Sequence, residues 1–261
     1  MTILDNDSDF DLQLEMPRAK PRSFFISLNY RLSTLGQAII GPERMLRLFL
    51  NGSWLWWRLA YEISARAYGD VFYVRGRALD EDLLRSLIPE GASFLDVGCG
   101  FGEWSRIAAK YARHVVGIDF DSSKIERARS LTVDENVEYR IGDLTSELGD
   151  RMFDVALLSH VIEHVSDADA LLSELRGVAS NIIVEVPDFE NDPLNWVRAK
   201  QNCPFYTDGD HVREYTMATL SDQLERNGWR ATEIKRRHGM LLAVAENFND
   251  TRPNELENGS N

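Results

Sequence analysis

Three glycines follow an acidic residue in the segment Asp96-Val-Gly98-Cys-Gly100-Phe-Gly102. Glycines at such a turn let the main chain approach a ligand closely, and a helix that begins after them offers unpaired N–H groups. Asp119 lies 21 residues beyond Gly98, and a carboxylate at that distance can accept hydrogen bonds from both hydroxyls of a ribose. Together these features predict a site for a ligand that contains a nucleoside.

The spacing of the glycines separates two kinds of nucleoside cofactor. A nicotinamide dinucleotide binds at G-x-G-x-x-G, where its pyrophosphate lies on the helix N-terminus. The run in this chain is G-x-G-x-G, and Asp96 stands before it, where an acidic side chain would repel a phosphate. An acidic residue there suits a ligand with an amino group and a sulfonium, such as S-adenosylmethionine.

The segment Leu95–Gly102 resembles the first motif of the class I S-adenosylmethionine-dependent methyltransferases, of the broad small-molecule group, and the likeness covers about residues 91–246. It implies that S-adenosylmethionine is the cofactor and that Gly98 and Gly100 line its methionine part. Arg75 or Arg77, ahead of the first strand, is placed by charge and position to pair with the cofactor carboxylate.

Later segments resemble the family's second, third and fourth motifs, in the expected order: Val116–Phe120, Gly142–Leu144 and Phe153–His160. The resemblance implies that Asp119 holds the ribose and that Phe120 lies on one face of the adenine. It implies that Asp143 accepts a hydrogen bond from the adenine amino group, while Leu144 donates its backbone N–H. Ser159, at the end of the fourth motif, would then lie just below the reactive methyl group.

A cluster of candidate catalytic residues follows the fourth motif: His160, Glu163 and His164, with His211 further along the chain. Methyl transfer to a hydroxyl requires removal of a proton, and histidine titrates near neutral pH. If a helix begins near Val161, His160 and His164 lie about one turn apart. We expect the segment around His211 to fold over the same pocket.

Three roles are open for this cluster: a proton acceptor, a ligand set for a divalent cation that binds a diol, or structural hydrogen bonding. The spacing resembles that of metal-dependent sugar or RNA-terminal 2′-O-methyltransferases only loosely, because His160 replaces the acid expected there. H-x-x-E-H also occurs on a long helix in zinc proteases, whereas here it follows a buried strand. Whether a metal is bound stays open.

The expected function is methyl transfer to a hydroxyl of a small polar molecule or a glycan. The alternatives are transfer to nitrogen, or to a lipid-linked or quinone acceptor. A non-catalytic cofactor-binding protein is less favoured because the first-motif glycines and Asp119 are all present, and a nicotinamide oxidoreductase is less favoured because the glycine spacing is G-x-G-x-G.

Regular alternation of strands and helices from Gly91 onward positions these residues. Continuously apolar strands are typical of a buried parallel sheet, which binds its ligands at the carboxyl ends of the strands. The sequence predicts an α/β fold: a doubly wound, mostly parallel, seven-stranded Rossmann-like sheet with an N-terminal helical cap. The predicted strands are 93–97, 114–119, 137–141, 153–159, 181–186, 232–235 and 241–245.

The predicted domains are an acidic disordered tail (1–22), the helical cap (23–90), a methyltransferase domain (91–247) and a second acidic tail (248–261). Within the methyltransferase domain, residues 188–212 form an expected substrate lid. A break at Gly52-Ser53 should divide the cap into two helices. Trp54, Trp56 and Trp57 interleave with arginines there, which is consistent with packing on the catalytic domain, contact with a membrane surface, or a dimer contact.

The formal net charge is −13, of which residues 1–16 carry −5 and residues 246–261 carry −3. No basic face is evident, so a long nucleic-acid partner is disfavoured. Cys99 and Cys203 lie far apart in no disulfide or metal pattern, which indicates a reducing compartment. The sequence shows no secretory signal and no apolar run of about 20 residues, so we expect a cytoplasmic protein.

Overall fold

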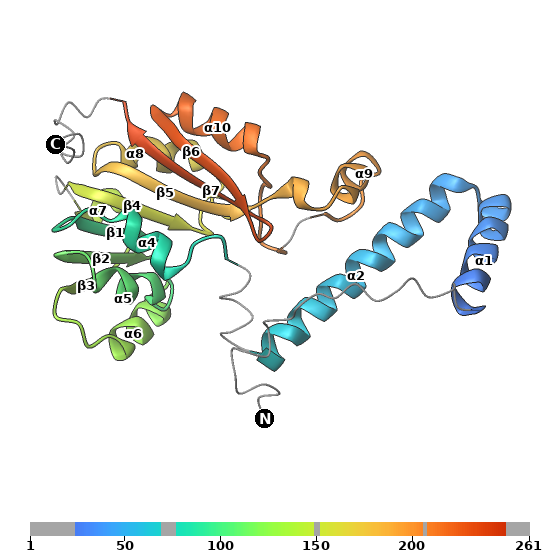
Figure 1. Cartoon of the computed structure of the whole chain (residues 1–261), viewed down its shortest axis with the longest axis horizontal. Helices are drawn as coiled ribbons and strands as arrows, with labels where there is room; N and C mark the ends of the chain where they lie inside the picture. The colour runs from blue at the N-terminus through green and yellow to red at the C-terminus, as the bar shows by residue number, and fades with distance from the viewer. Residues whose placement is uncertain (1–23, 69–76, 149–151, 206–207, 249–261) are drawn as a thin grey trace, which may run out of the picture. The chain divides into compact units, whose positions relative to one another are not determined.

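The computed structural model describes residues 24–68, 77–148, 152–205 and 208–248 (Figure 1). These residues belong to two compact units. A helical unit contains residues 24–68 and 192–205, and a sheet unit contains the described residues of 77–191 and 208–248. The predicted tail 1–22, residues 249–261 of the predicted tail 248–261, and Arg75 lie outside the described residues.

The helical unit contains α1 (Phe24–Ile40) and α2 (Pro42–Tyr68), which are separated by Gly41. The predicted break at Gly52-Ser53 is wrong, because α2 continues through it. One glycine inside a helix costs only about 1 kcal/mol, and the neighbouring apolar residues favour the helix. Ser53 Oγ donates to the Leu50 carbonyl, 2.9 Å away, so the serine bonds within the helix instead of ending it.

Helix α9 (Leu194–Lys200) belongs to the same unit as α2. The Arg198 guanidinium donates to Ser53 Oγ over 3.1 Å, and the Arg47 guanidinium donates to Gln201 Oε1 over 3.1 Å. Within the described ranges, no helix combines the length and the apolar character needed to cross a membrane.

The sheet unit contains one seven-stranded sheet with the strand order β3-β2-β1-β4-β5-β7-β6. Strands β1 to β5 are parallel, and β7 runs antiparallel to both β5 and β6. The strands are β1 (Ser93–Val97), β2 (His114–Asp119), β3 (Val137–Ile141), β4 (Phe153–Ser159), β5 (Ala179–Pro187), β6 (Trp229–Arg237) and β7 (Met240–Asn247). The predicted fold class is confirmed, and the order reverses between β1 and β4, the point where such sheets bind ligands.

Both faces of the sheet are covered by helices (Figure 1). Alternate residues of β4 point to opposite faces: Ala156 and Leu158 share one buried cluster with Leu172, whereas Val155 and Leu157 belong to another. Helices α8 and α10 lie on the first side, and α4, α5 and α6 lie on the second. The α-helices of the sheet unit are α4 (Glu81–Leu87), α5 (Glu103–Ala109), α6 (Ser122–Leu131), α7 (Leu144–Leu148), α8 (Ala168–Leu175) and α10 (Met217–Arg226).

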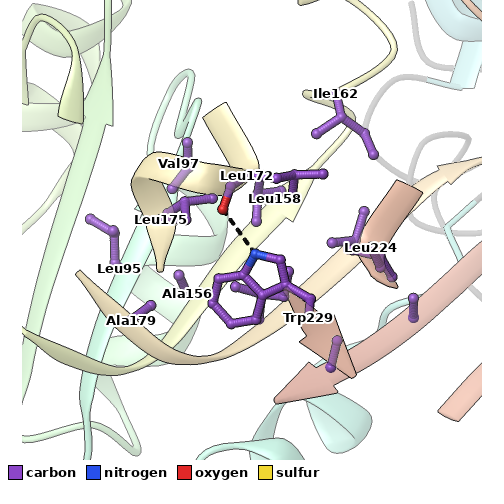
Figure 2. Packing of buried hydrophobic residues seen from close by; sticks show 14 of the residues in the cluster. Leu95, Val97, Ala156, Leu158, Ile162, Leu172, Leu175, Ala179, Leu224 and Trp229 are labelled. Carbon is purple, nitrogen blue, oxygen red and sulfur yellow. Dashed lines mark hydrogen bonds between the residues drawn. The ribbon is translucent and has the colours of Figure 1, made fainter. Parts of the chain in front are cut away.

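Trp229 anchors the antiparallel edge of the sheet to the core (Figure 2). Its side chain is fully buried, and its indole Nε1 donates to the Leu172 carbonyl of α8 over 2.9 Å. Figure 2 shows the ring among Ala156, Leu172 and Leu224. A buried indole N–H needs such a partner, so this contact holds α8 and β6 in one fixed relation.

Candidate functional site

The turn after β1 is packed on one side and open on the other. Gly98 and Gly100 have φ angles of 66° and 53°, in the left-handed region that favours glycine. A Cβ atom on Gly98 would lie 2.8 Å from Val161 Cγ2, whereas a Cβ atom on Gly100 would meet no atom within 4 Å. The open side at Gly100 therefore leaves the main chain accessible to a ligand.

Asp119 is buried at the end of β2, and two backbone N–H groups orient its carboxylate. Gly100 N donates to Oδ2 over 3.0 Å, and Asp121 N donates to Oδ1 over 2.9 Å. Each carboxylate oxygen has more than one acceptor position. The group can therefore accept further hydrogen bonds beside the open glycine turn, as binding of a ribose would require.

Asp96 lies inside β1, directly under the turn, and is buried. Ser105 Oγ donates to its Oδ2 over 2.6 Å. Burial raises the pKa of Asp96 to about 7, with a smaller contribution from the Asp119 charge, and the Ser105 hydrogen bond opposes this rise. A cationic ligand nearby would favour the ionised form of this carboxyl.

The residues predicted to contact the adenine differ in exposure. Phe120 is 84% exposed, and its ring centroid lies 6.0 Å from Lys124 Nζ. Asp143 is also exposed, whereas the Leu144 side chain is buried in the core, which leaves only the backbone of Leu144 for the predicted contact. The roles assigned to these residues in cofactor binding stay predictions.

Arg77 lies beside the glycine turn through its contacts with α5. Its Nη1 lies 2.8 Å from Glu103 Oε2, and its guanidinium carbon lies 5.3 Å from the centroid of the Trp104 ring. The predicted ion pair with a cofactor carboxylate would therefore have to compete with Glu103.

Glu185 of β5 organises the ends of the central strands, and the sequence predictions did not include it. Its side chain is fully buried, Oε1 accepts from Ala78 N and Leu79 N over 2.6 and 3.0 Å, and Oε2 accepts from Ser159 Oγ over 2.7 Å. The predicted site residue Ser159 thus bonds to a neighbouring strand. The available signal was a single acidic residue inside the otherwise apolar run 182–186, since buried charges need partners.

His160 directly follows β4 with a φ of 55°, an uncommon conformation for a residue other than glycine. Its Nδ1 lies 3.1 Å from Glu163 Oε1. Burial disfavours the charged ring, but the hydrogen bond and the charge of Glu163 outweigh it, so the pKa of His160 is raised. No helix begins at Val161, so the condition that would set His160 and His164 one helical turn apart is not met: a turn closed by His164 N and the Val161 carbonyl lies there, and α8 begins at Ala168.

Three of the four predicted catalytic side chains converge: Glu163, His164 and His211 each place a ligand atom within 4.8 Å of the others. The two imidazole rings meet edge to face, with centroids 4.6 Å apart. Val212 N donates to the Glu163 carbonyl over 2.9 Å, which joins the two chain segments. Val161, the residue that packs on Gly98, belongs to the same turn, so the cluster lies next to the open glycine turn.

Glu214 orients His211. His211 Nδ1 lies 3.0 Å from Glu214 Oε1, and both side chains are almost completely buried. Burial lowers the pKa of His211, but the hydrogen bond and the charge of Glu214 more than offset this, so the net shift is upward. A neutral His211 that donates from Nδ1 to Glu214 carries its lone pair on Nε2. Glu214 was not among the predicted residues.

Comparison with known proteins supports the resemblance to S-adenosylmethionine-dependent methyltransferases. Residues 95–181 match the family model described as a methyltransferase domain. The chain is 29% identical over 178 residues to a probable S-adenosylmethionine-dependent methyltransferase of Mycolicibacterium smegmatis, covering 60% of this chain and 63% of the relative. It is 35% identical over 88 residues to a ubiquinone biosynthesis O-methyltransferase of Brucella ovis, covering 32% of this chain and 35% of the relative.

Among solved structures, an S-adenosylmethionine-dependent methyltransferase from Mesorhizobium loti superposes with a TM-score of 0.52 at 20% identity, covering 64% of this chain and 98% of that one. The chain spans less than two thirds of the length of the curated relatives it matches. The family match runs from β1 into β5. It therefore includes the glycine turn, Asp119, and the segment that contains His160, Glu163 and His164. With this sheet order and these likenesses, the chain contains a methyltransferase domain and has the fold of S-adenosylmethionine-dependent methyltransferases.

Proposed function

We propose that this protein transfers the methyl group of S-adenosylmethionine to a hydroxyl oxygen of a small polar molecule or a glycan. The residues around the turn suit this cofactor. The open side at Gly100 leaves room beside the main chain, and the Asp119 carboxylate is already oriented by two backbone N–H groups. Asp96 would lie near the cofactor's positive charges, and exposed Phe120 would offer a face to the adenine.

Methyl transfer forms a bond from the acceptor oxygen to the methyl carbon supplied by the cofactor, leaves the electron pair of the broken bond on sulfur, and releases the hydroxyl proton. A hydroxyl has a high pKa, so the chain must assist loss of that proton. The convergence of Glu163, His164 and His211 beside the cofactor turn carries the proposal. As free groups these side chains accept a proton; as ligands they would hold a cation that makes the hydroxyl more acidic.

The test is transfer of labelled methyl from S-adenosylmethionine to a probe set that contains a catechol, a nucleoside 2′,3′-diol, a hexose and a primary amine. We expect label on an oxygen-bearing probe, identified by the mass of one added methyl group. His164→Asn and His211→Asn should lower turnover at least tenfold while binding of S-adenosylhomocysteine persists. Label on the amine alone, or near wild-type turnover in both variants, would contradict the proposal.

A lipid-linked acceptor is a second candidate, and the exposed apolar residues of α2 favour it. Trp56 is 72% exposed, and Leu48, Phe49 and Trp57 are also exposed. Arginines interleave with them along the same helix: Arg44, Arg47 and Arg58. A helix with exposed aromatic residues and arginines can lie in the headgroup region of an anionic membrane.

Co-sedimentation of the full chain with phosphatidylglycerol vesicles tests this candidate. We expect binding that weakens in Trp56→Gln, whereas Trp196→Gln, which changes an exposed tryptophan of α9, serves as the matched control. If wild type stays in the supernatant with both phosphatidylglycerol and phosphatidylcholine vesicles, the membrane contact is wrong and the soluble acceptor classes remain.

A further inference from the structure

Glu163 carries a buried oxygen that has no hydrogen-bond partner among the described residues. Its side chain is fully buried, and Oε1 lies 3.1 Å from His160 Nδ1. Oε2 has no hydrogen bond within the described part of the chain. Buried carboxylate oxygens are almost always satisfied, because leaving one without a partner costs its full desolvation penalty. We therefore expect this oxygen to bind a group that is not part of the protein chain.

The two histidines next to Glu163 have different surroundings. His164 Nδ1 lies 3.3 Å from Asp210 Oδ2 but makes no hydrogen bond in the described structure. His211 has an arrangement that is common among metal-ligating histidines, in which a carboxylate binds one ring nitrogen and leaves the other nitrogen to face an ion. Glu214 supplies that carboxylate, 3.0 Å from His211 Nδ1.

We propose that Glu163, His164 and His211 bind one divalent transition-metal cation. Two imidazoles and one carboxylate match the donor set that Zn²⁺ and Mn²⁺ accept in catalytic sites. Their ligand atoms lie within 4.8 Å of one another, so small side-chain rotations bring them to bonding distance. The cation would give the buried Glu163 Oε2 the partner that it lacks among the described residues.

The three ligands come from two chain segments that are already held together. Val212 N donates to the Glu163 carbonyl over 2.9 Å. The Arg213 guanidinium donates to the Val165 and Ser166 carbonyls over 3.1 and 2.6 Å. These contacts fix the segment that carries His211 against the turn that carries Glu163, so the site needs no refolding to form.

Three protein ligands leave coordination positions for other oxygens, as in catalytic metal sites. An acceptor with two adjacent oxygens, such as a diol or a catechol, could fill them and place one oxygen beside the cofactor turn. This choice of acceptor rests on the proposed methyl transfer, whereas cation binding itself does not.

The direct test is calorimetric titration of Mn²⁺, and separately Zn²⁺, into the full chain after EDTA treatment. We expect one high-affinity ion per chain, and loss of that event in Glu163→Gln and in His211→Asn. Glu214→Gln keeps the ligands but removes the orienting carboxylate, so it should weaken binding by about 10- to 100-fold. Glu126→Gln, which removes an exposed carboxylate on α6, should bind the ion as wild type does.

Circular dichroism and binding of S-adenosylhomocysteine should show that each variant is folded. Wild-type binding that is equally strong in Glu163→Gln and His211→Asn would overturn the proposal, because the ion would then lie elsewhere. Absence of a high-affinity event with both ions would overturn it as well. Since neither titration depends on turnover, cation binding and methyl transfer can fail independently and be distinguished.

Discussion

Alanine substitutions at Gly98 and Gly100 should separate the packed side of the cofactor turn from its open side. Both residues have positive φ angles, 66° and 53°, and alanine in this region costs about 1–2 kcal/mol. At Gly98 the new methyl group would also lie 2.8 Å from Val161 Cγ2, and such overpacking adds about 1–3 kcal/mol. We therefore expect Gly98→Ala to lose about 2–5 kcal/mol, and Gly100→Ala about 1–2 kcal/mol.

Affinity for the cofactor should follow a different order from stability. The methyl group of Gly100→Ala meets no protein atom within 4 Å, so it would stand in the space that we assign to the cofactor. Urea unfolding measures the stability of each variant, and calorimetric titration with S-adenosylhomocysteine measures its affinity. Gly100→Ala should be the more stable of the two variants and still bind the ligand at least tenfold more weakly than wild type.

The double variant Gly98→Ala/Val161→Ala is the matched control for the steric contribution. Removing the Val161 methyl groups should recover part of the stability lost in Gly98→Ala, but not the part due to φ. Equal destabilisation by Gly98→Ala and Gly100→Ala, or wild-type affinity in Gly100→Ala, would refute this account of the turn.

Two further predictions concern buried carboxyl groups. Glu185→Gln replaces an acceptor of three hydrogen bonds by a group with only one acceptor oxygen. Thermal unfolding should therefore show that the free energy of unfolding falls by about 1–3 kcal/mol, and that it falls less in Ser159→Ala. Wild-type stability in Glu185→Gln would contradict the role assigned to Glu185. Burial raises the pKa of Asp96 from 3.8 to about 7, so the folded protein binds an extra proton between these values and wild type loses stability as pH rises through this window. Asp96→Asn lacks this titration, so its stability relative to wild type should increase from about pH 5 to about pH 8; a constant difference would show that Asp96 does not titrate there.

Much of the sheet was predictable because its central strands are buried on both faces and therefore form continuous apolar runs. The bounds predicted for β4 from Phe153 to Ser159 are those observed. The edge strand β6 was predicted only over 232–235, whereas it extends from Trp229 to Arg237. Its backbone pairing with β7 continues through charged residues that face solvent, and an apolar pattern does not reveal such residues.

The candidate site was predictable in residue types but not in its pairings. His211 was grouped with Glu163 and His164 because its segment was expected to fold over the same pocket, and the structure brings the three side chains together. The Glu185 and Glu214 contacts depend on strand register and on loop conformation, which local sequence does not specify. No helix begins at Val161, because His160 adopts a left-handed conformation and directs the chain into a turn.

Calorimetric titration of S-adenosylhomocysteine into the full chain and into Asp119→Asn tests whether the Asp119 carboxylate holds the cofactor ribose. Asparagine keeps an acceptor for Gly100 N but loses the carboxylate that should hold the ribose. We expect one ligand per wild-type chain and at least about tenfold weaker binding in Asp119→Asn, a difference of about 1.4 kcal/mol. Wild-type affinity in the variant, or no binding of S-adenosylhomocysteine and S-adenosylmethionine to wild type, would contradict it.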